Sequence, residues 1–390
     1  MKFRKLARRR REFEMCSFCG GCVDNCAAYR GKGWESYSGR GKLRLVRSDL
    51  RGWYQDDAAL VDRVFTCTAC RACDLNCEAG LRPSELVHAA RVQTYEDGRV
   101  PPALREFTSQ LAEDKNPSGR SHDARLAWRD KARQLLDPNS GALLFAGCYA
   151  SYQGEQALLK ILRLLAKVGH RPRAFPGERC CGLVAHQLGD LKVAQALASE
   201  NLAAISDAAK DGVERVVFPC PSCLSFLLEA VSSGLWGTKG ELAALDGVEF
   251  ATWFDVLLPN LDDLPLRDLS GVVVTYHDPC HLARYRGVVD PPRQVLRKTG
   301  ATLVEMERSG ANASCCGGGG GLMVHDSNAG LEVALRRVGD ALATGAEALF
   351  TACFTCRDVL EGAAFRSDEA MERELEVLHL VDAFEDEFGA

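Results

Sequence analysis

The sequence predicts a multidomain protein in which a mainly helical N-terminal domain precedes two duplicated α/β domains rich in cysteine. Three observations support this prediction. Two runs near the N-terminus each hold four cysteines at one spacing, and a five-cysteine pattern occurs twice further along the chain. Each copy of that longer pattern also alternates short apolar runs with helical stripes. A repeat of this length indicates duplicated domains and not short solenoid units.

The composition is that of an ordinary globular protein with an unusual amount of cysteine. The chain has 390 residues, of which 46% are apolar, 26% are charged and 18 are cysteine. No apolar run has the length of a membrane span, and no apolar core follows the basic N-terminus, so we expect neither a transmembrane segment nor a secretory signal. We therefore expect a cytoplasmic protein whose cysteines are metal ligands, catalytic thiols or buried residues and not disulfides.

Charge is distributed unevenly along the chain, although the net charge is only -5. Residues 1–52 carry 14 Lys and Arg against 5 Asp and Glu, whereas residues 365–390 carry 2 against 9. Either both ends are simply solvated, or the basic end docks on an acidic partner or an anionic membrane surface. The second alternative gives a peripheral location on the cytoplasmic membrane face through a partner. No nucleic acid is expected as a partner, because no reader motif accompanies the basic charge.

Two N-terminal cysteine runs share one spacing and differ by 51 residues at all four positions. They are Cys16-x-x-Cys19-x-x-Cys22-x-x-x-Cys26 and Cys67-x-x-Cys70-x-x-Cys73-x-x-x-Cys77. This is the spacing of the bacterial two-cluster ferredoxin, in which the fourth cysteine of each run ligates the other cubane [4Fe–4S] cluster. By this rule Cys77 completes the site of the first run, and Cys26 completes the site of the second.

One detail departs from the small ferredoxins, and one alternative stays open. Ala27 and Glu78 stand where a proline usually follows the fourth cysteine, which leaves the ligand set itself unchanged. The alternative is a pair of zinc sites with four cysteine ligands each. The spacing of the fourth cysteine favours cubane clusters over zinc.

Helical stripes surround these runs and define the domain order. Leu43, Val46 and Leu50 recur at helical spacing, as do Leu60, Val61 and Val64, and a further helix is expected to start at Pro83. We expect a ferredoxin-like domain over 1–110, a connector over 111–140, a first cysteine-rich domain over 141–262 and a second over 263–390. The stretch 100–140 is rich in proline and glycine and is expected to hold one or two short helices.

The five-cysteine pattern is the central feature of the rest of the chain. Its first copy is Cys148, then Cys180-Cys181 followed by Gly182, then Cys220-Pro-Ser-Cys223. Its second copy is Cys280, then Cys315-Cys316 followed by Gly317, then Cys353-Phe-Thr-Cys356. Equivalent cysteines are offset by 132, 135 and 133 residues.

Apolar runs and helical stripes give both copies the same α/β order. In the first copy we expect strands at 142–148, 171–175 and 213–220 and helices at 158–168 and 190–210. In the second copy we expect strands at 271–280, 301–307 and 348–353 and helices at 291–299 and 328–343, the last one capped by Ser327. The repeat is expected to extend further, because 248–257 resembles 375–384, including Asp255 and Asp382. Cysteines at strand ends lie at the edge where open α/β sheets place their sites.

The cysteine and glycine positions favour a metal cluster. Helix N-termini after Cys181, Cys220 and Cys353 would direct backbone N–H groups at thiolates. Gly182, Gly317 and Gly318 would let the backbone approach a bulky cluster and donate hydrogen bonds to it. A phosphate cradle is the alternative for the run Gly317–Gly321, which lacks the Lys-Ser/Thr of a nucleotide loop. Five sulfurs exceed the need of one zinc ion or one cubane, which implies a non-standard cluster or a spare thiol.

The same residues resemble a known family. The repeated cysteine pattern, the segment YHDPCHLARYRG (276–287), the SCCGGGGG run and TCTACRACDLNCEAG (66–80) are similar to the CCG domain pair and ferredoxin part of heterodisulfide reductases. The order of domains resembles the D-type subunit of heterodisulfide reductases, or their C-type and B-type subunits joined. It is also similar to the iron-sulfur subunits of glycolate, lactate and anaerobic glycerol-3-phosphate dehydrogenases.

The resemblance implies four clusters, two cubane and two noncubane [4Fe–4S]. Each noncubane cluster would be held by the five cysteines of one CCG copy, with one CCG site holding zinc or a cubane cluster as the second choice. The noncubane sets are Cys148, Cys180, Cys181, Cys220 and Cys223, and Cys280, Cys315, Cys316, Cys353 and Cys356. In the family two facing clusters split a disulfide, so no protein acid or base is required and no catalytic residue is assigned.

Two functions follow from the resemblance. The first is a subunit of an anaerobic oxidoreductase that carries electrons through ferredoxin clusters to the CCG sites for disulfide or thiol chemistry. The second is a pure electron-transfer subunit that links a flavoprotein dehydrogenase or an electron-bifurcating complex to a quinone, cytochrome b or low-potential acceptor. Either one needs flavoprotein or membrane cytochrome partner subunits, because the chain has no nucleotide fingerprint of its own.

The disulfide function makes one geometric demand. Both CCG sites should face one solvent-reachable cleft, with at least one of the nearby histidines, His186, His277 or His281, at its wall. These histidines are interpreted mainly as packing or supporting residues, and proton donation to a product thiolate is the alternative. Tyr149, Tyr276 and Tyr285 are expected to be packing residues.

Overall fold

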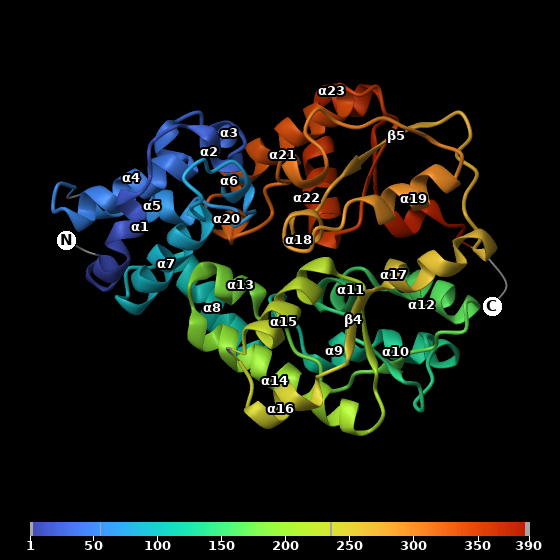
Figure 1. Cartoon of the computed structure of the whole chain (residues 1–390). Coiled ribbons are helices and arrows are strands. Elements are labelled where there is room, and N and C mark those ends of the chain that lie inside the picture. The colour runs from blue at the N-terminus through green and yellow to red at the C-terminus, as the bar shows by residue number, and fades with distance from the viewer. Residues whose placement is uncertain (1–2, 55, 235, 387–390) are drawn as a thin grey trace.

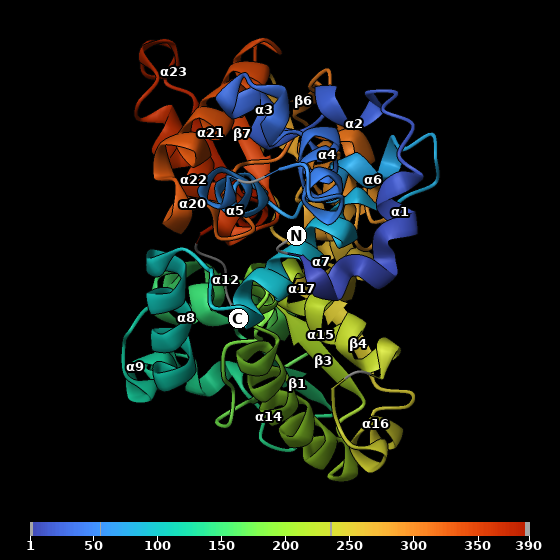
Figure 2. The same ribbon diagram turned by 90° about the vertical axis from the view of Figure 1, so that its left-hand side faces the viewer.

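Two α/β halves and a smaller helical domain make up the chain in a computed structural model that describes residues 3–54, 56–234 and 236–386. Figure 1 shows one α/β half in green and yellow below, the other in orange and red above, and the blue helical domain beside both. Figure 2 shows the helical domain from the front, where it covers the line along which the two halves meet. The expected order of a ferredoxin-like domain followed by two cysteine-rich domains is confirmed.

Short helices wrap the N-terminal cysteine runs. They are η1 (Arg4–Arg9), α1 (Arg10–Glu14), α2 (Gly21–Asp24), α3 (Ala27–Lys32), η2 (Glu35–Tyr37), α4 (Gly39–Leu50), α5 (Asp57–Phe65), α6 (Ala72–Leu75) and α7 (Pro83–Glu96). The predicted stripes of α4 and α5 are confirmed, since Leu43, Val46, Leu60 and Val64 are buried in one core. Pro83 opens α7 at the first helical position, where its missing N–H costs nothing.

The connector is more helical than the one or two short helices expected. It holds α8 (Pro102–Asp114), α9 (His122–Leu126), α10 (Trp128–Lys131) and η3 (Arg133–Leu135). The paired prolines before α8 suggested a loop, but Pro102 is a helix starter, and Leu104, Thr108 and Leu111 form one buried stripe. This helix runs across the predicted boundary at 110/111, and the domain limits stay a proposal.

The first α/β domain is a four-stranded parallel sheet in the order β2-β1-β3-β4. Its strands are β1 (Ala142–Leu144), β2 (Arg173–Ala174), β3 (Arg215–Phe218) and β4 (Glu249–Thr252). Its helices are α11 (Cys148–Tyr152), α12 (Glu155–Lys167), α13 (Leu183–Leu188), α14 (Leu191–Lys210), α15 (Pro221–Ser233), α16 (Lys239–Ala244), α17 (Trp253–Leu257) and η4 (Leu258–Asp263). The central strands β1 and β3 are largely apolar because helices cover both faces of a parallel sheet.

The second domain repeats this architecture in the order β6-β5-β7-β8. Its strands are β5 (Val273–His277), β6 (Thr302–Leu303), β7 (Ala348–Thr351) and β8 (Glu376–His379). Its helices are α18 (Cys280–Ala283), α19 (Asp290–Lys298), η5 (Gly310–Asn312), α20 (Leu322–His325), α21 (Ser327–Leu342), α22 (Phe354–Ala364), α23 (Asp368–Glu372) and η6 (Leu380–Ala383). The predicted cap of α21 was wrong by one residue, since the Asp326 side chain accepts the N–H of Ala329.

The predicted extension of the repeat is confirmed by the fourth strand of each sheet. Strands β4 and β8 occupy equivalent edges and are each followed by a capped turn. The Asp255 carboxylate accepts the N–H of Thr252, and the Asp382 carboxylate accepts the N–H of His379. The similarity of 248–257 and 375–384 therefore reflects one shared strand-and-cap unit.

Arg91 ties the three domains together. Its buried guanidinium donates hydrogen bonds of 2.6 to 3.0 Å to five backbone carbonyls. Three of these carbonyls lie in the helical domain, at Val64, Phe65 and Cys67, while Gln187 is in the first α/β domain and Gly320 is in the second. Leaving a buried donor unpaired costs free energy. The hydrogen bonds of Arg91 therefore fix the positions of these three backbone segments relative to one another.

Gly320 offers a direct test of this junction. An added Cβ would overlap the Cys67 carbonyl oxygen and lie 2.9 Å from the Thr68 Cα, and its φ of +64° disfavours any other residue. We expect Gly320→Ala to lower the free energy of unfolding by about 2 kcal/mol or more. The control is Gly339→Ala in α21, where an added Cβ meets nothing within 4 Å, so a gain of roughly 0.5–1 kcal/mol is expected. Equal thermal unfolding midpoints of the two variants under anaerobic conditions would contradict this account.

Candidate metal centres

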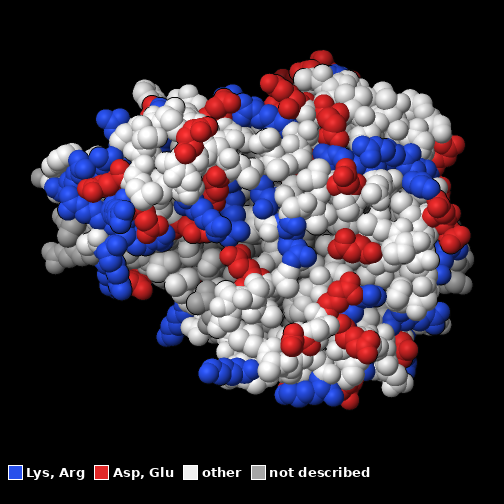
Figure 3. All heavy atoms as spheres, viewed as in Figure 1, with Lys and Arg blue, Asp and Glu red and all other residues white. Residues whose placement is uncertain are grey.

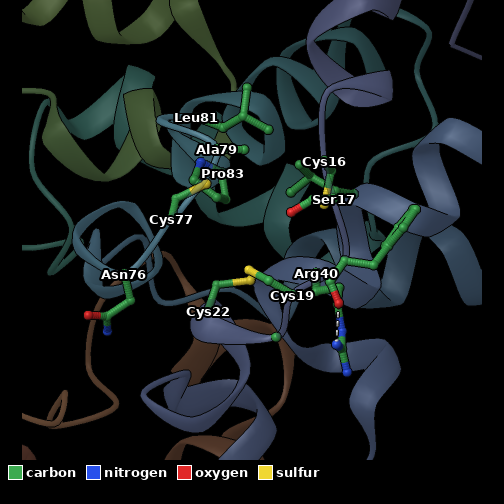
Figure 4. Close-up of a pocket in the computed structure, with 13 residues that line it drawn as sticks. Cys16, Ser17, Cys19, Cys22, Arg40, Asn76, Cys77, Ala79, Leu81 and Pro83 are labelled. Atoms are coloured by element: carbon green, nitrogen blue, oxygen red, sulfur yellow. Dashed lines mark hydrogen bonds between the residues drawn. The ribbon is translucent and has the colours of Figure 1, made fainter.

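The two N-terminal cysteine runs come together in the crossed arrangement that the spacing predicts. Cys77 lines one small cavity with the first three cysteines of the other run, Cys16, Cys19 and Cys22, as Figure 4 shows. Cys26 lines a second cavity with Cys67, Cys70 and Cys73. Each run therefore sends its fourth cysteine to its neighbour, and two sets of four thiols result.

Backbone N–H groups support these sulfurs. The N–H groups of Gly21, Arg40, Tyr29 and Ala72 hydrogen-bond to the sulfurs of Cys19, Cys22, Cys26 and Cys70 respectively. Burial raises the pKa of Cys22 to about 11, so a thiolate there needs a nearby positive charge. Cys19 is the exposed cysteine of the chain, and the first site therefore reaches the surface.

All ten cysteines of the two CCG copies line one cavity of about 370 Å³ between the α/β domains. In each domain, the first three strands in chain order are each followed by one or two of these cysteines. Cys148 and Cys220 follow β1 and β3, and Cys280 and Cys353 follow β5 and β7, at the position where the strand order reverses. Open parallel sheets bind ligands at this switch point, and here two such edges face each other.

The glycines after each Cys-Cys pair act through their backbone. Gly182 and Gly317 adopt φ of +96° and +92°, which other residues rarely adopt. Their N–H groups hydrogen-bond to the sulfurs of Cys180 and Cys315, and the N–H of Gly318 lies 3.5 Å from the Cys316 Sγ. The three predicted cofactor glycines thus direct donors at cysteine sulfurs.

The glycine run has a second purpose that the sequence analysis did not foresee. Gly318 to Gly321 line the cavity as expected, but Gly319 and Gly320 also pack on the backbone of Cys67 and Thr68. An added Cβ on Gly319 would lie 2.5 Å from the Thr68 carbonyl oxygen. The absence of side chains therefore also serves close docking of the helical domain.

Cysteine side chains lie next to one another in an unbroken series from the first CCG site to the helical domain. The series runs Cys148, Cys180, Cys181, Cys223, Cys220, Cys353, Cys356, Cys316, Cys315 and Cys70. Two of its steps cross domains. Cys220 meets Cys353 between the CCG copies, and Cys315 meets Cys70 of the second ferredoxin site. The second CCG site therefore lies between the ferredoxin sites and the first CCG site.

The three predicted histidines have three different positions. His281 lines the cavity, and its ring is held by Ser225 at 2.7 Å and Gln187 at 3.2 Å. His277 lies behind the wall, where its Nδ1 accepts from Arg337 and the ring hydrogen-bonds to Cys316. His186 lies outside the cavity and packs against His88 with ring centroids 4.3 Å apart, so of the three candidates for the wall only His281 lines it among the described residues.

His277 bears on the zinc alternative. One of its ring nitrogens and the sulfurs of Cys316 and Cys356 lie within 4.8 Å of one another, which is a compact three-donor set. Because Nδ1 accepts from Arg337, the proton lies on Nε2, which is then the donor to Cys316. This tautomer suits a residue that supports a thiolate ligand better than a metal ligand.

The three tyrosines were expected to pack, and only Tyr276 is a plain core residue. Tyr149 lines the cavity and donates its hydroxyl to Asp358. Tyr285 donates to the Ala69 carbonyl at 2.7 Å, and the Arg71 guanidinium lies 3.8 Å from its ring centre. Tyr285 therefore holds the loop of the second ferredoxin run against the second CCG domain.

Arg284 is a functional residue that spacing alone does not reveal. Its guanidinium donates to the carbonyls of Cys70, Ala311 and Ala313 at 2.6 to 3.0 Å, so it joins a ferredoxin cysteine to the loop before Cys315. Its buried Nη2 has no hydrogen-bond partner among the described residues, and none of the ion pairs found there includes Arg284. A buried cation with an unpaired donor beside many thiols indicates that the neighbouring sites carry negative charge.

Comparisons with known proteins agree with these sites. The chain matches the Cysteine-rich domain family twice, at residues 142–227 and 274–361, and the 4Fe-4S dicluster domain family at residues 12–81. It is 30% identical to the D-type subunit of the dihydromethanophenazine:CoB–CoM heterodisulfide reductase of Methanosarcina acetivorans over 90% of this chain and 89% of that protein.

More distant relatives have other functions. A probable glycolate oxidase iron-sulfur subunit of Bacillus subtilis is 24% identical over 94% of this chain and 92% of the relative. An EtfAB:quinone oxidoreductase of Syntrophomonas wolfei is 26% identical over 88% of this chain and 54% of the relative. Fold, sites and similarity together define an iron-sulfur oxidoreductase subunit. The chain belongs to the family of D-type heterodisulfide reductase subunits.

The residues fit iron-sulfur clusters. The matched dicluster domain indicates two [4Fe–4S] clusters in the helical domain, where two sets of four thiols converge. The CCG sites offer dense buried thiols, backbone donors and the unpaired Arg284 donor, which suit an anionic cluster. Within the described residues, no helix is long and apolar enough to cross a membrane.

The crossed ferredoxin arrangement predicts an unusual mutant phenotype. Cys77→Ala should impair the cluster of Cys16, Cys19 and Cys22, although Cys77 belongs to the other run. The control is Cys73→Ala, which should impair the cluster completed by Cys26. Electron paramagnetic resonance of the two reduced variants separates the outcomes, and identical spectra would rule out the crossover.

Arg284 should set reduction potentials on both sides of the domain contact. Arg284→Gln removes a positive charge beside Cys70 and Cys315, so clusters bound at these sites should become harder to reduce, by roughly 50–100 mV. The matched control is Arg308→Gln, since Arg308 joins the same domains through an ion pair with Asp24. Potentiometric titration that finds equal shifts in both variants would contradict this role.

Proposed function

We propose that this protein is the iron-sulfur subunit of an anaerobic oxidoreductase that reduces a small disulfide at the cavity between its CCG domains. The observation that carries the proposal is that all ten CCG cysteines line one cavity. Splitting a disulfide at two metal sites requires that one sulfur of the substrate reaches the first CCG site while the other sulfur reaches the second. Clusters bound there would supply the electrons and bind the substrate sulfurs through iron.

The reaction balances with two electrons and two protons for each disulfide. The S–S bond breaks, and each sulfur takes one electron and one proton to give two thiols. A reduced flavoprotein or a membrane cytochrome partner would supply the electrons, since the sequence shows no fingerprint for FAD or NAD. Protons come from solvent through the mouth of the cavity, where Met323 and Val324 are 38% and 39% exposed.

The chain's own residues arrange the sites in series. The exposed Cys19 belongs to the first ferredoxin set, and Cys70 of the second set contacts Cys315. Cys353 then contacts Cys220 of the first CCG site. This order supports entry of electrons at the first ferredoxin site and use of them at the CCG cavity.

The face around Cys19 suits an acidic partner. Figure 3 shows Lys and Arg side chains gathered over the helical domain. Arg40, Arg44 and Arg47 recur along one side of α4, and Arg51 follows its last residue. The guanidiniums of Arg44 and Arg47 lie 5.9 and 5.1 Å from the Phe18 ring centre. Basic charge that surrounds an exposed redox site steers acidic partners to it. Partner docking on this face is therefore part of the proposal.

A pure electron relay is the second candidate function. The similarity to a quinone oxidoreductase and to a glycolate oxidase subunit favours it, because neither printed activity is that of a disulfide reductase. In a relay the CCG cavity would be sealed by a partner subunit and would not admit substrate.

Iron content and turnover test the proposal together. Two cubane and two noncubane clusters predict about 16 iron atoms per chain in protein purified without oxygen. With reduced methyl viologen as the electron donor, this protein should reduce a small disulfide such as bis(2-hydroxyethyl) disulfide. Full iron content without any turnover would favour the relay, whereas half the iron with stoichiometric zinc would exclude clusters from the CCG sites.

A further inference from the structure

A second large cavity lies outside the metal sites, where the helical domain meets both α/β domains. It is a groove of about 820 Å³, which is larger than the CCG cavity. Helix α7 and η1 line one side of it, and α7 packs on α13 of the first α/β domain (Figure 1). Grooves of this size at domain junctions commonly bind small molecules.

The groove shares side chains with the walls of two metal sites. Arg71 and Ser84 line both the groove and the cavity of the second ferredoxin set. Gln187 lines both the groove and the CCG cavity. Tyr285 lines the groove, and its ring stacks on the ring of His281, which lines the CCG cavity, with centroids 4.2 Å apart. One layer of side chains therefore separates the groove from both sites, which favours a ligand that exchanges electrons.

Flat side chains line much of the groove. The rings of His88 and His186 lie 4.3 Å apart, and the Trp236 ring meets that of His186 edge-on at 5.4 Å. Burial lowers the pKa of His186 to about 3 and also lowers that of His88, so both rings are uncharged near neutral pH. The Arg71 guanidinium lies 3.8 Å from the Tyr285 ring centre, and its side chain stays 28% exposed. Aromatic rings and a guanidinium plane suit stacking on a planar aromatic ligand.

The charges of the groove leave one cation available at its rim. All the charged side chains that line it except Arg8 have ion-pair partners among the described residues. These pairs are Lys5–Glu96, Arg9–Glu12, Arg71–Glu229 and Glu85–Arg82. Arg8 is exposed and belongs to none of the ion pairs found in the described part of the chain. It is therefore placed to receive an anionic group of a ligand.

We propose that this groove binds a planar aromatic redox carrier with an anionic arm, of the flavin mononucleotide (FMN) class, which passes electrons to the second ferredoxin site. The reduced carrier gives up two electrons in two one-electron steps and releases two protons to solvent at the open groove. The inference rests on the proposed electron transfer through the ferredoxin sites and applies to either candidate function. It adds an entry point for electrons that bypasses the first ferredoxin site.

Binding of two flavins tests the ligand class. FMN and riboflavin have the same ring system, but only FMN carries a phosphate. With iron-loaded full-length protein kept without oxygen, quenching of flavin fluorescence should give a micromolar dissociation constant for FMN. We expect FMN to bind about fivefold more tightly than riboflavin, because Arg8 contacts only the phosphate.

Two variants separate the arm from the ring. Arg8→Glu should abolish the preference for FMN and leave riboflavin binding unchanged. Its matched control is Arg11→Glu, since Arg11 on α1 is also exposed but does not line the groove. Ala89→Trp fills the groove and should weaken both flavins by about tenfold or more. Its control is Ala112→Trp on the exposed side of α8.

The entry point is tested in the Cys77→Ala variant, whose first ferredoxin cluster is impaired. Reduced FMN should still reduce the cluster completed by Cys26 at the wild-type rate, because the groove adjoins that site directly. Stopped-flow absorbance with electron paramagnetic resonance of quenched samples follows this step. Reduction by dithionite shows separately that the cluster is present.

The outcomes separate the inference from the function beneath it. Flavin binding weaker than about 1 mM, or an unchanged ratio of FMN to riboflavin affinity in Arg8→Glu, overturns the inference and leaves the proposed function standing. Loss of reduction by FMN in Cys77→Ala, while dithionite still reduces the second ferredoxin cluster, also overturns it. If iron-loaded protein reduced by dithionite passes no electrons to a disulfide, the proposed disulfide function fails, whereas flavin binding and cluster reduction still decide the inference.

Discussion

The burial of so many thiols is the constraint on which the rest of the structure depends. A thiolate away from water is unstable unless positive charge and hydrogen bonds offset it. Here backbone donors come from tight turns, as at Gly182 and Gly317, and cations come from buried guanidiniums. Arg125 contacts Cys148, and Arg284 reaches Cys70 from the second CCG domain. These groups would compensate the negative charge of thiolates that bind a metal cluster, so they suit occupied sites.

Duplication converts one kind of site into a facing pair. A single parallel sheet presents its cysteines at one edge, at the point where the strand order reverses. Two copies placed edge to edge bring Cys220 and Cys353 into contact and enclose a common cavity. The helical domain fixes this geometry from the side, because Arg91 hydrogen-bonds to backbone of all three domains. The cavity is thus a property of the whole chain and not of either copy.

Sequence reasoning was successful where chemistry depends on local spacing. The crossed roles of Cys26 and Cys77, the strand before each cysteine and the repeat at Asp255 and Asp382 all follow from short-range pattern. Sequence reasoning failed where a residue contacts a segment that is far away in the sequence. Nothing near Arg284 or Gly319 indicates that each meets the second ferredoxin run, and His186 follows Cys181 closely yet faces His88 on α7. The connector was misjudged because Pro102 begins a helix as readily as it ends one.

The two CCG copies have the same cysteine pattern, but they occupy different positions relative to the ferredoxin domain. Only the second copy contacts the ferredoxin domain through a cysteine, at Cys315 and Cys70, among the residues that the structure describes. Arg284 belongs to that copy, whereas the first copy has Arg125, whose charge Glu178 already neutralises. A compensated cation influences the charge state of its neighbour less than an uncompensated one does. The two CCG sites therefore differ in electrostatics as well as in their position relative to the ferredoxin domain.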